Sequence, residues 1–90
     1  MEDMKEKVWT ISVDLQETDD DTQATAHLKV GDKTYGGWGR ARRNPQDPNV
    51  PRIGDELAVS RALSDLSHHL IDDVAAEIER FEGNPVSVHP

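Results

Sequence analysis

The sequence has no cysteine, few aromatic residues and no long hydrophobic run. Its 90 residues include two tryptophans, one tyrosine and one phenylalanine. Without cysteine the chain cannot form a disulfide or a thiolate metal site, and a reducing cytoplasm is the expected location. Hydrophobic residues make up 34% of the chain, and none of their runs approaches the roughly 20 residues of a membrane span. The sequence therefore predicts one small cytoplasmic domain, residues 1–90, whose thin core a second subunit would help to stabilise.

Positive charge is also scarce, and it is concentrated in the middle of the chain. The net charge is −8, from 18 acidic and 10 basic residues. Residues 22–52 carry a local charge of +4, whereas residues 1–21 and 53–90 each carry −6. Because binding depends on the local potential, the basic middle can still meet an anion, although the overall field slows the approach of nucleic acid.

Alternating hydrophobic and polar residues predict two strands. The first strand, over about 7–16, places four hydrophobic residues on a face that we expect to be buried: Trp9, Ile11, Val13 and Leu15. The second strand, over 23–30, has the same alternation and is followed by the turn residues Gly31 and Asp32. A glycine in a two-residue turn is typical of a tight antiparallel hairpin.

A third strand, over 33–42, has two very different faces. Small residues alternate with an aromatic residue and two cations, in the order Gly37, Trp38, Gly39, Arg40, Ala41 and Arg42. Glycine weakens a strand, and one reason to tolerate it is that another backbone approaches closely. We therefore expect a helix to lie across the glycines, with the tryptophan and the arginines on the opposite face.

The remaining chain predicts a loop, one helical region and a tail. The loop, over 43–53, is expected to be shaped by Asn44, Pro45, Asp47 and Pro51. Gly54 or Asp55 would cap a helical region over about 55–82, whose hydrophobic residues recur every three or four positions. An unbroken helix of that length overhangs the strands, so either it breaks near 67–73 or its end packs on a second subunit. The tail, 83–90, could add a short fourth strand. The predicted fold class is α+β, a three-stranded antiparallel sheet on a C-terminal helix.

The strongest candidate for a binding site is the cationic face of the third strand. Arginine side chains bind phosphates, and tryptophan and arginine side chains stack on bases. The residues of this site are Trp38, Arg40, Arg42 and Arg43, extended by Lys29, Lys33 and Arg52. Alternatively, these cations pair with acidic residues of the hairpin, of the helix or of a second subunit, and the tryptophan is buried in a dimer interface. Asp65, His69 and Asp73 share one helical face and could hold a divalent metal, or they form a solvated face with weak ion pairs, which we favour. The sequence predicts no cofactor, no metal and no catalytic residue.

The stretch GRARRNPQDPNVPRIGDELAVSRALSDL, residues 39–66, resembles the signature of a family of short uncharacterised proteins from high-GC Gram-positive bacteria, some of them associated with hypoxia or dormancy. The resemblance extends more loosely over most of the chain. It implies a fold similar to a double-stranded-RNA-binding domain without its first helix, and it implies dimerisation. It also implies a structural likeness to ribosome hibernation factors, and so a link to translation.

Two functions from different classes follow. The first is a stress-associated or dormancy-associated protein that binds ribosomes or RNA through the arginines. The second is a homodimeric protein–protein interaction module without nucleic acid. The acidic helix disfavours the first, since it cannot lie against RNA as in other double-stranded-RNA binders. An enzyme, a membrane partner and a small-molecule substrate are not expected.

Overall fold

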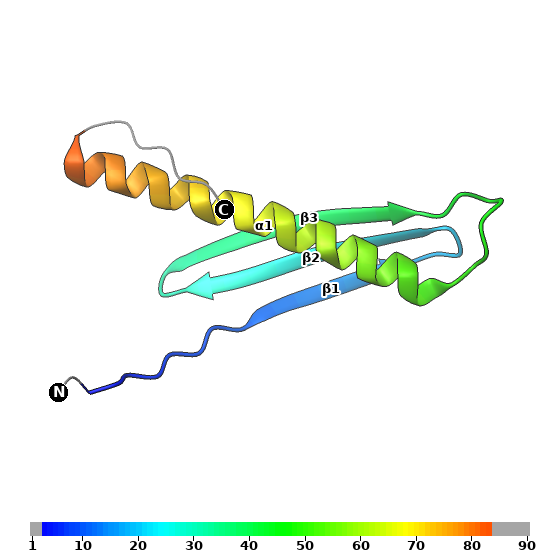
Figure 1. Cartoon of the computed structure of the whole chain (residues 1–90), viewed down its shortest axis with the longest axis horizontal. Helices are drawn as coiled ribbons and strands as arrows, with labels where there is room; N and C mark the ends of the chain where they lie inside the picture. The colour runs from blue at the N-terminus through cyan, green and yellow to red at the C-terminus, as the bar shows by residue number, and fades with distance from the viewer. Residues whose placement is uncertain (1–2, 84–90) are drawn as a thin grey trace.

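The computed structural model describes residues 3–83, in which three strands precede one helix. The strands are β1 (Ile11–Glu17), β2 (Asp21–Val30) and β3 (Lys33–Arg42), and the helix is α1 (Pro51–Glu82). The strands form an antiparallel sheet in the order β1-β2-β3, and α1 crosses one face of it (Figure 1). The predicted α+β fold is confirmed. The tail in which we expected a fourth strand lies outside the described residues, apart from Gly83.

The observed bounds differ from the expected ones mainly at the ends of β1 and α1. Strand pairing in β1 begins at Ile11, and residues 3–10 are extended and do not pair with another strand of the described chain (Figure 1). The helix begins at Pro51 rather than near Asp55, and Val50 precedes it without a side-chain cap. Proline fits the first helical turn because its missing N–H would have no partner there. Gly54 and Asp55 therefore lie inside α1 and do not cap it.

The contact between α1 and the sheet is a close approach of two backbones. A Cβ atom added to Gly37 would collide with the backbone of Ala62 and Leu66, and one added to Gly39 would collide with the backbone of Ala58 and Ala62. The two glycines therefore let α1 lie directly on β3, as their spacing predicted. We call this contact the glycine seam.

The core beneath the glycine seam is built from small side chains. Seven hydrophobic residues are buried, namely Ala24, Ala26, Leu28, Ala41, Ala58, Ala62 and Leu66. Five of the seven are alanines, so the helix can approach the sheet closely over β2 as well as over β3. Each alanine buries little apolar surface, and the hydrophobic stabilisation per contact is correspondingly small.

The helix runs unbroken for 32 residues, which corresponds to about 48 Å. It crosses the sheet obliquely, and its C-terminal turns project beyond the β2–β3 turn (Figure 1). Phe81 in this overhang is 90% exposed. Of the two arrangements that the sequence allowed, an interrupted helix or an overhanging one, the structure has the second.

The glycine seam predicts different effects for two neighbouring glycines. Gly37→Ala places a Cβ against helix backbone, and overpacking of this kind lowers the free energy of unfolding by about 1–3 kcal/mol. For a domain of this size, each kcal/mol lowers the melting temperature by roughly 4–8 °C. Gly36→Ala is the matched control, because its Cβ would meet only the carbonyl oxygen of Ala26, at 3.8 Å. Thermal unfolding followed by circular dichroism measures both. Equal melting temperatures for the two variants would contradict the close contact.

Candidate functional site

Four of the predicted binding residues project from the face of the sheet opposite α1, three of them from β3. In β3 they alternate with the glycines of the seam, so Trp38, Arg40 and Arg42 point outward, as predicted. Trp38 is 52% exposed. Lys29 lies on the same outer face, paired in register with Thr34 near the other end of the sheet. The outer face therefore presents an exposed tryptophan beside two arginines, with one lysine at a distance along the sheet.

Arg40 is already paired within the chain. Its Nε and Nη2 donate hydrogen bonds to the two carboxylate oxygens of Asp21, at 2.7 and 3.1 Å. The Arg40 hydrogen bond is the main reason that the pKa of Asp21 is lowered, and it also raises the pKa of Arg40. A phosphate would have to compete with a bidentate carboxylate for this guanidinium.

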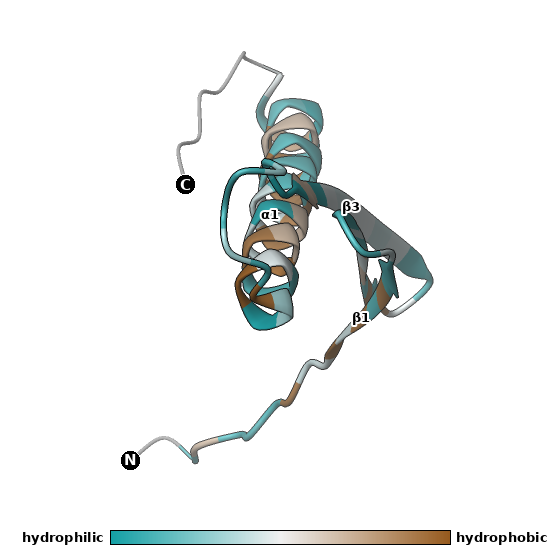
Figure 2. Cartoon of the chain, turned by 90° about the vertical axis from the view of Figure 1, so that its right-hand side faces the viewer, coloured by the Kyte–Doolittle hydropathy of each residue, from teal (hydrophilic) through white to brown (hydrophobic). Residues whose placement is uncertain are grey.

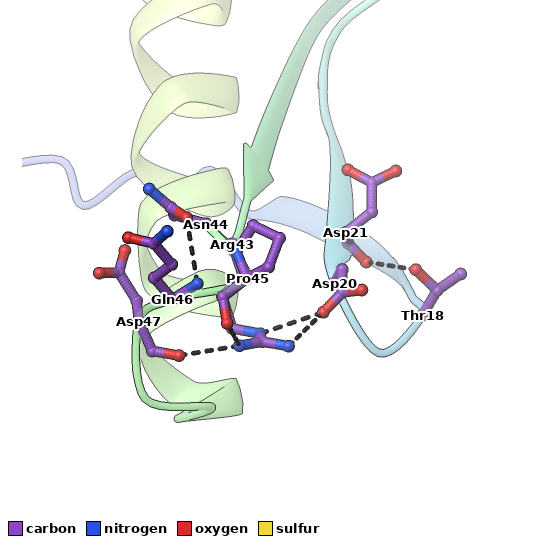
Figure 3. Close-up of polar contacts among 8 residues, drawn as sticks. All are labelled: Thr18, Asp20, Asp21, Arg43, Asn44, Pro45, Gln46 and Asp47. Atoms are coloured by element: carbon purple, nitrogen blue, oxygen red, sulfur yellow. Dashed lines mark hydrogen bonds and ion pairs between the residues drawn. The ribbon is translucent and has the colours of Figure 1, made fainter.

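Arg43 fastens the loop that follows β3 to the turn between β1 and β2 (Figure 3). Its guanidinium donates to Asp20 Oδ1 at 2.5 and 3.1 Å and to the carbonyl of Asp47 at 2.8 Å. Within the same loop, Asn44 Oδ1 accepts a hydrogen bond from the backbone N–H of Gln46 at 3.1 Å. Arg43 thus has a structural role, since its donors serve the loop and the turn.

Two further cations of the predicted site also have partners. Lys33 lies on the α1 side of the sheet, where its ammonium pairs with Asp73 at 2.9 Å and with Glu77. The placement of Lys33 with the arginines was therefore wrong, because the strand alternation puts it on the opposite face. Arg52 is in the first turn of α1 and lies 3.5 Å from Glu56. Of the seven predicted site residues, Lys29 and Arg42 are the cations without an ion pair inside residues 3–83.

The outer edge of β3 is covered by side chains of α1. Arg61 Nη1 donates to the carbonyl of Arg40 at 2.6 Å, and Asp65 accepts from the backbone N–H of Trp38 at 2.9 Å. His69 Nδ1 lies 2.6 Å from the carbonyl of Gly36 and must donate to it. These three residues recur every fourth position along one flank of α1, and we call them the edge guard. Unpaired strand edges recruit other strands, so the edge guard closes this side of the sheet.

We interpreted Asp65, His69 and Asp73 above as a metal site or, as we favoured, a solvated face with weak ion pairs. A weak ion pair is present, since His69 Nε2 lies 3.6 Å from Asp65 Oδ1 and both side chains are partly exposed. The three residues also contact β3, which we did not expect. Asp65 and His69 each serve a different backbone group of β3, while Asp73 accepts a hydrogen bond from the Tyr35 hydroxyl at 2.6 Å. No cluster of three metal-ligating side chains is present among residues 3–83. The signal that we missed was the combination of this spacing with a glycine-rich strand, which brings helix side chains within reach of the strand edge.

The Asp55 carboxyl lies beside Glu17, at the end of β1. One of its carboxylate oxygens, Oδ1, is buried and has no hydrogen-bond partner among residues 3–83. The neighbouring carboxyl of Asp55 raises the pKa of Glu17, chiefly through a shared hydrogen bond. The start of α1 and the end of β1 therefore meet through two acids that repel when both are ionised.

A shallow hollow of about 570 Å³ lies between the β1–β2 turn, the loop after β3 and the start of α1. Its apolar wall includes Val50, Ile53 and Leu57, and its charged rim includes Asp20 and Arg43. These two rim charges are paired with each other. The hollow carries charges of both signs, so it does not define one class of ligand.

A second exposed surface lies on the α1 side of the sheet, over β1. The register places Ile11 and Leu15 beside Leu28 and Ala24, on the face that α1 covers elsewhere. The helix contacts mainly β3 and β2 and touches β1 only slightly. Ile11 is consequently 43% exposed and Leu15 47%. The expectation that this face of β1 is buried holds only for Val13, which is partly buried against the core. The glycine seam holds α1 over β3 and β2, so the rest of the β1 face is left uncovered.

The flank of α1 opposite the edge guard is hydrophobic. The edge guard contacts the edge of β3. Leu63 and Val74 lie about half a turn away around the helix, so they are on the flank of α1 that faces β1. Both residues are more than a third exposed, and Trp9, which continues the alternation before β1, is 60% exposed. Figure 2 shows hydrophobic segments on α1 and on β1 with the chain before it. We call Trp9, Ile11, Leu15, Leu63 and Val74 the open apolar face.

Acid should weaken the contact between β3 and α1. Hydrogen bonds from Tyr35 and then Lys33 hold the pKa of Asp73 below its ordinary value of 3.8. Because the pKa of Asp73 is lower in the folded state, its ionised carboxylate stabilises the fold at pH values above the unfolded pKa. That stabilisation is lost as the pH falls through the folded pKa. We therefore expect Tyr35→Phe to melt below wild type at neutral pH and to approach wild type well below pH 3.8. An equal deficit at both pH values, measured by thermal unfolding, would contradict this role of Tyr35.

Comparisons with known proteins agree with this architecture. The profile of the Rv2632c-like family matches residues 7–87. The uncharacterized protein Mb1767 of Mycobacterium bovis is 43% identical over 77 residues, which cover 86% of this chain and 82% of that protein. The uncharacterized protein Rv2632c of Mycobacterium tuberculosis is 41% identical over 81 residues, which cover 90% and 87%. The crystal structure of Rv2632c matches with a TM-score of 0.83 and 38% identity, over 93% of this chain and 100% of that one. Within residues 3–83, no helix is long and apolar enough to span a bilayer.

Proposed function

The chain belongs to the Rv2632c-like family, and we propose that it is a homodimeric protein–protein interaction module that binds through its open apolar face. The observation that carries this proposal is the exposure of large hydrophobic side chains on β1 and on α1, on the same side of the sheet. Large exposed hydrophobic side chains that gather on one side of a protein mark interaction surfaces in soluble proteins.

The open apolar face follows from the way the chain folds. The glycine seam fixes α1 over β3 and β2, and the small residues of the seam form the core. The larger hydrophobic residues, including Ile11, Leu15 and Leu63, are left at the margin of that core with 39–47% of their surface exposed. A second copy offers the same hydrophobic residues in a complementary position, as an isologous interface requires.

The ribosome or RNA function receives less support from the geometry. Arg40 and Arg43 are held by Asp21 and Asp20, so the outer face offers phosphate only Arg42 and the distant Lys29 as unpaired cations within residues 3–83. Non-specific binding of nucleic acid depends on neutralising many phosphates, and the chain has a net charge of −8. The stress or dormancy role, the likeness to hibernation factors, the absence of catalysis and the cytoplasmic location remain predictions.

The two tryptophans give a matched test of the dimer. Trp9 lies on the open apolar face and Trp38 on the outer face, and they are 60% and 52% exposed. A buried tryptophan at an interface contributes about 2 kcal/mol or more, so Trp9→Ala should weaken dimerisation by at least roughly thirty-fold. Trp38→Ala should leave the dissociation constant close to wild type.

Sedimentation equilibrium over a range of concentrations measures the dissociation constants, and Leu63→Glu should give a folded monomer because it places a charge on the same face. A wild-type chain that remains monomeric up to its solubility limit would reject the proposal. A larger loss from Trp38→Ala than from Trp9→Ala would move the interface to the outer face.

Sedimentation with purified ribosomes at low salt tests the other function. We expect no association, because the unpaired cations of the outer face are too few to hold a phosphate backbone against the net charge. Association that weakens with salt, and whose salt dependence decreases in Arg42→Ala, would favour the RNA function instead. Arg80→Ala, a cation change in the last turn of α1 and away from the outer face, is the control.

A further inference from the structure

The two edges of the sheet differ in a way that indicates how a second copy binds. The outer edge of β3 is closed by the edge guard, whose three side chains contact the backbone of Gly36, Trp38 and Arg40. No hydrogen bond among residues 3–83 reaches the outer edge of β1. Among residues 3–83, β1 therefore offers the more open edge for pairing with another strand.

The contacts of the edge guard also identify which backbone groups of β3 point outward. They are the groups of even-numbered residues, so the odd-numbered residues of β3 hydrogen bond to β2, among them Gly37 opposite Ala26. In an antiparallel sheet a residue that bonds to one neighbouring strand does not bond to the other. Odd-numbered residues of β2 consequently bond to β1.

The same rule assigns the backbone groups of β1. His27 in β2 pairs with Ser12, so the even-numbered residues of β1 bond inward. The N–H and C=O groups of Ile11, Val13 and Leu15 then point to the open edge. The residues with free backbone groups are thus also those whose side chains lie on the α1 side, next to or within the open apolar face.

Building on the proposed dimer, we infer that two copies pair antiparallel through β1 and form one continuous six-stranded sheet. A two-fold axis perpendicular to the sheet keeps both copies of α1 on the same face. The open apolar faces of the two copies then meet over the β1–β1 junction. This single arrangement both pairs the free backbone groups of β1 and buries the open apolar faces. Pairing through the edge of β3, or packing through the outer face, would not do both.

Charge favours one of two neighbouring registers of this pairing. Centring the axis on Val13 places Asp14 opposite the partner's Ser12 and Ile11 opposite the partner's Leu15. Centring it on Asp14 would place two carboxylates directly opposite each other, which is unfavourable in a strand pair. Both registers set odd-numbered residues against odd-numbered residues, so in either one the outward N–H and C=O groups bond to each other.

Amide hydrogen exchange tests the inference on the full chain. At concentrations where the dimer forms, exchange at Ile11, Val13 and Leu15 should slow by at least roughly ten-fold relative to dilute samples. The amides of Ser12 and Asp14, which bond to β2 in either state, are the internal control. A dimer without added protection at the odd-numbered amides would overturn the β1 pairing and leave the dimer itself intact. A monomer at all concentrations would reject both.

A pair of variants at one position separates the backbone from the side chain. Leu15→Ala and Leu15→Pro both remove the leucine side chain, but only proline also removes the outward N–H. An edge strand tolerates proline at such a position. Leu15→Pro should raise the dissociation constant by roughly ten-fold more than Leu15→Ala, since two copies each lose a hydrogen bond. Circular dichroism must show both variants folded, and if Leu15→Pro unfolds, the exchange experiment decides alone. Equal dissociation constants for folded variants would overturn the inference.

A third measurement excludes the tail as the occupant of the edge. Removing residues 84–90 should leave both the dimer and the protection of the odd-numbered β1 amides unchanged. Loss of that protection on truncation would assign the β1 edge to the tail and overturn the pairing of β1 with β1.

Discussion

The structure depends on the close contact between the backbone of α1 and the glycines of β3. Any side chain at Gly37 or Gly39 would occupy space that belongs to the helix backbone. Since the closest approach determines where a helix can lie on a sheet, this contact places α1 over β3 and β2 and away from β1. The small core, the edge guard and the open apolar face are consequences of that position.

Because α1 lies so close to the edge strand β3, polar side chains of each element reach the other. Arg61, Asp65 and His69 reach over β3 and bond to three of its outward backbone groups. At the other end, Lys33 and Tyr35 converge on Asp73. Charged residues that the sequence alone would place in solvent thus hold the helix to the strand. Several of the cations in this acidic chain form ion pairs within the fold.

Much of the fold was predictable because each part depended on a local pattern. The alternation in β1 and β2, the glycine spacing in β3 and the stripe of α1 each follow from the geometry of one element, and the two-sided character of β3 was confirmed. The start of α1 was misplaced, since Pro51 and Asp55 are both plausible near a helix start and only tertiary contacts decide between them. The bidentate pairing of Arg40 with Asp21 was one of several alternatives that the sequence left open.

The exposure of the β1 face was not predictable in the same way. A period of two identifies which residues share a face, but it does not say whether one helix is wide enough to cover three strands. That outcome depends on the lateral position of α1, which is set by two glycines some twenty residues further along the chain. The candidate surface thus arises from a long-range relation between elements, which no local pattern shows.

The glycine seam also has a thermodynamic character of its own. Alanine and glycine have no side-chain rotamers to lose, so ordering this layer costs no rotamer entropy, although each glycine surrenders more backbone freedom than other residues. A contact formed in this way has no alternative packing to which it can relax. Helix and sheet should therefore dock as rigid bodies in a single arrangement, with the thermal motion of the domain confined to the surfaces where longer side chains remain.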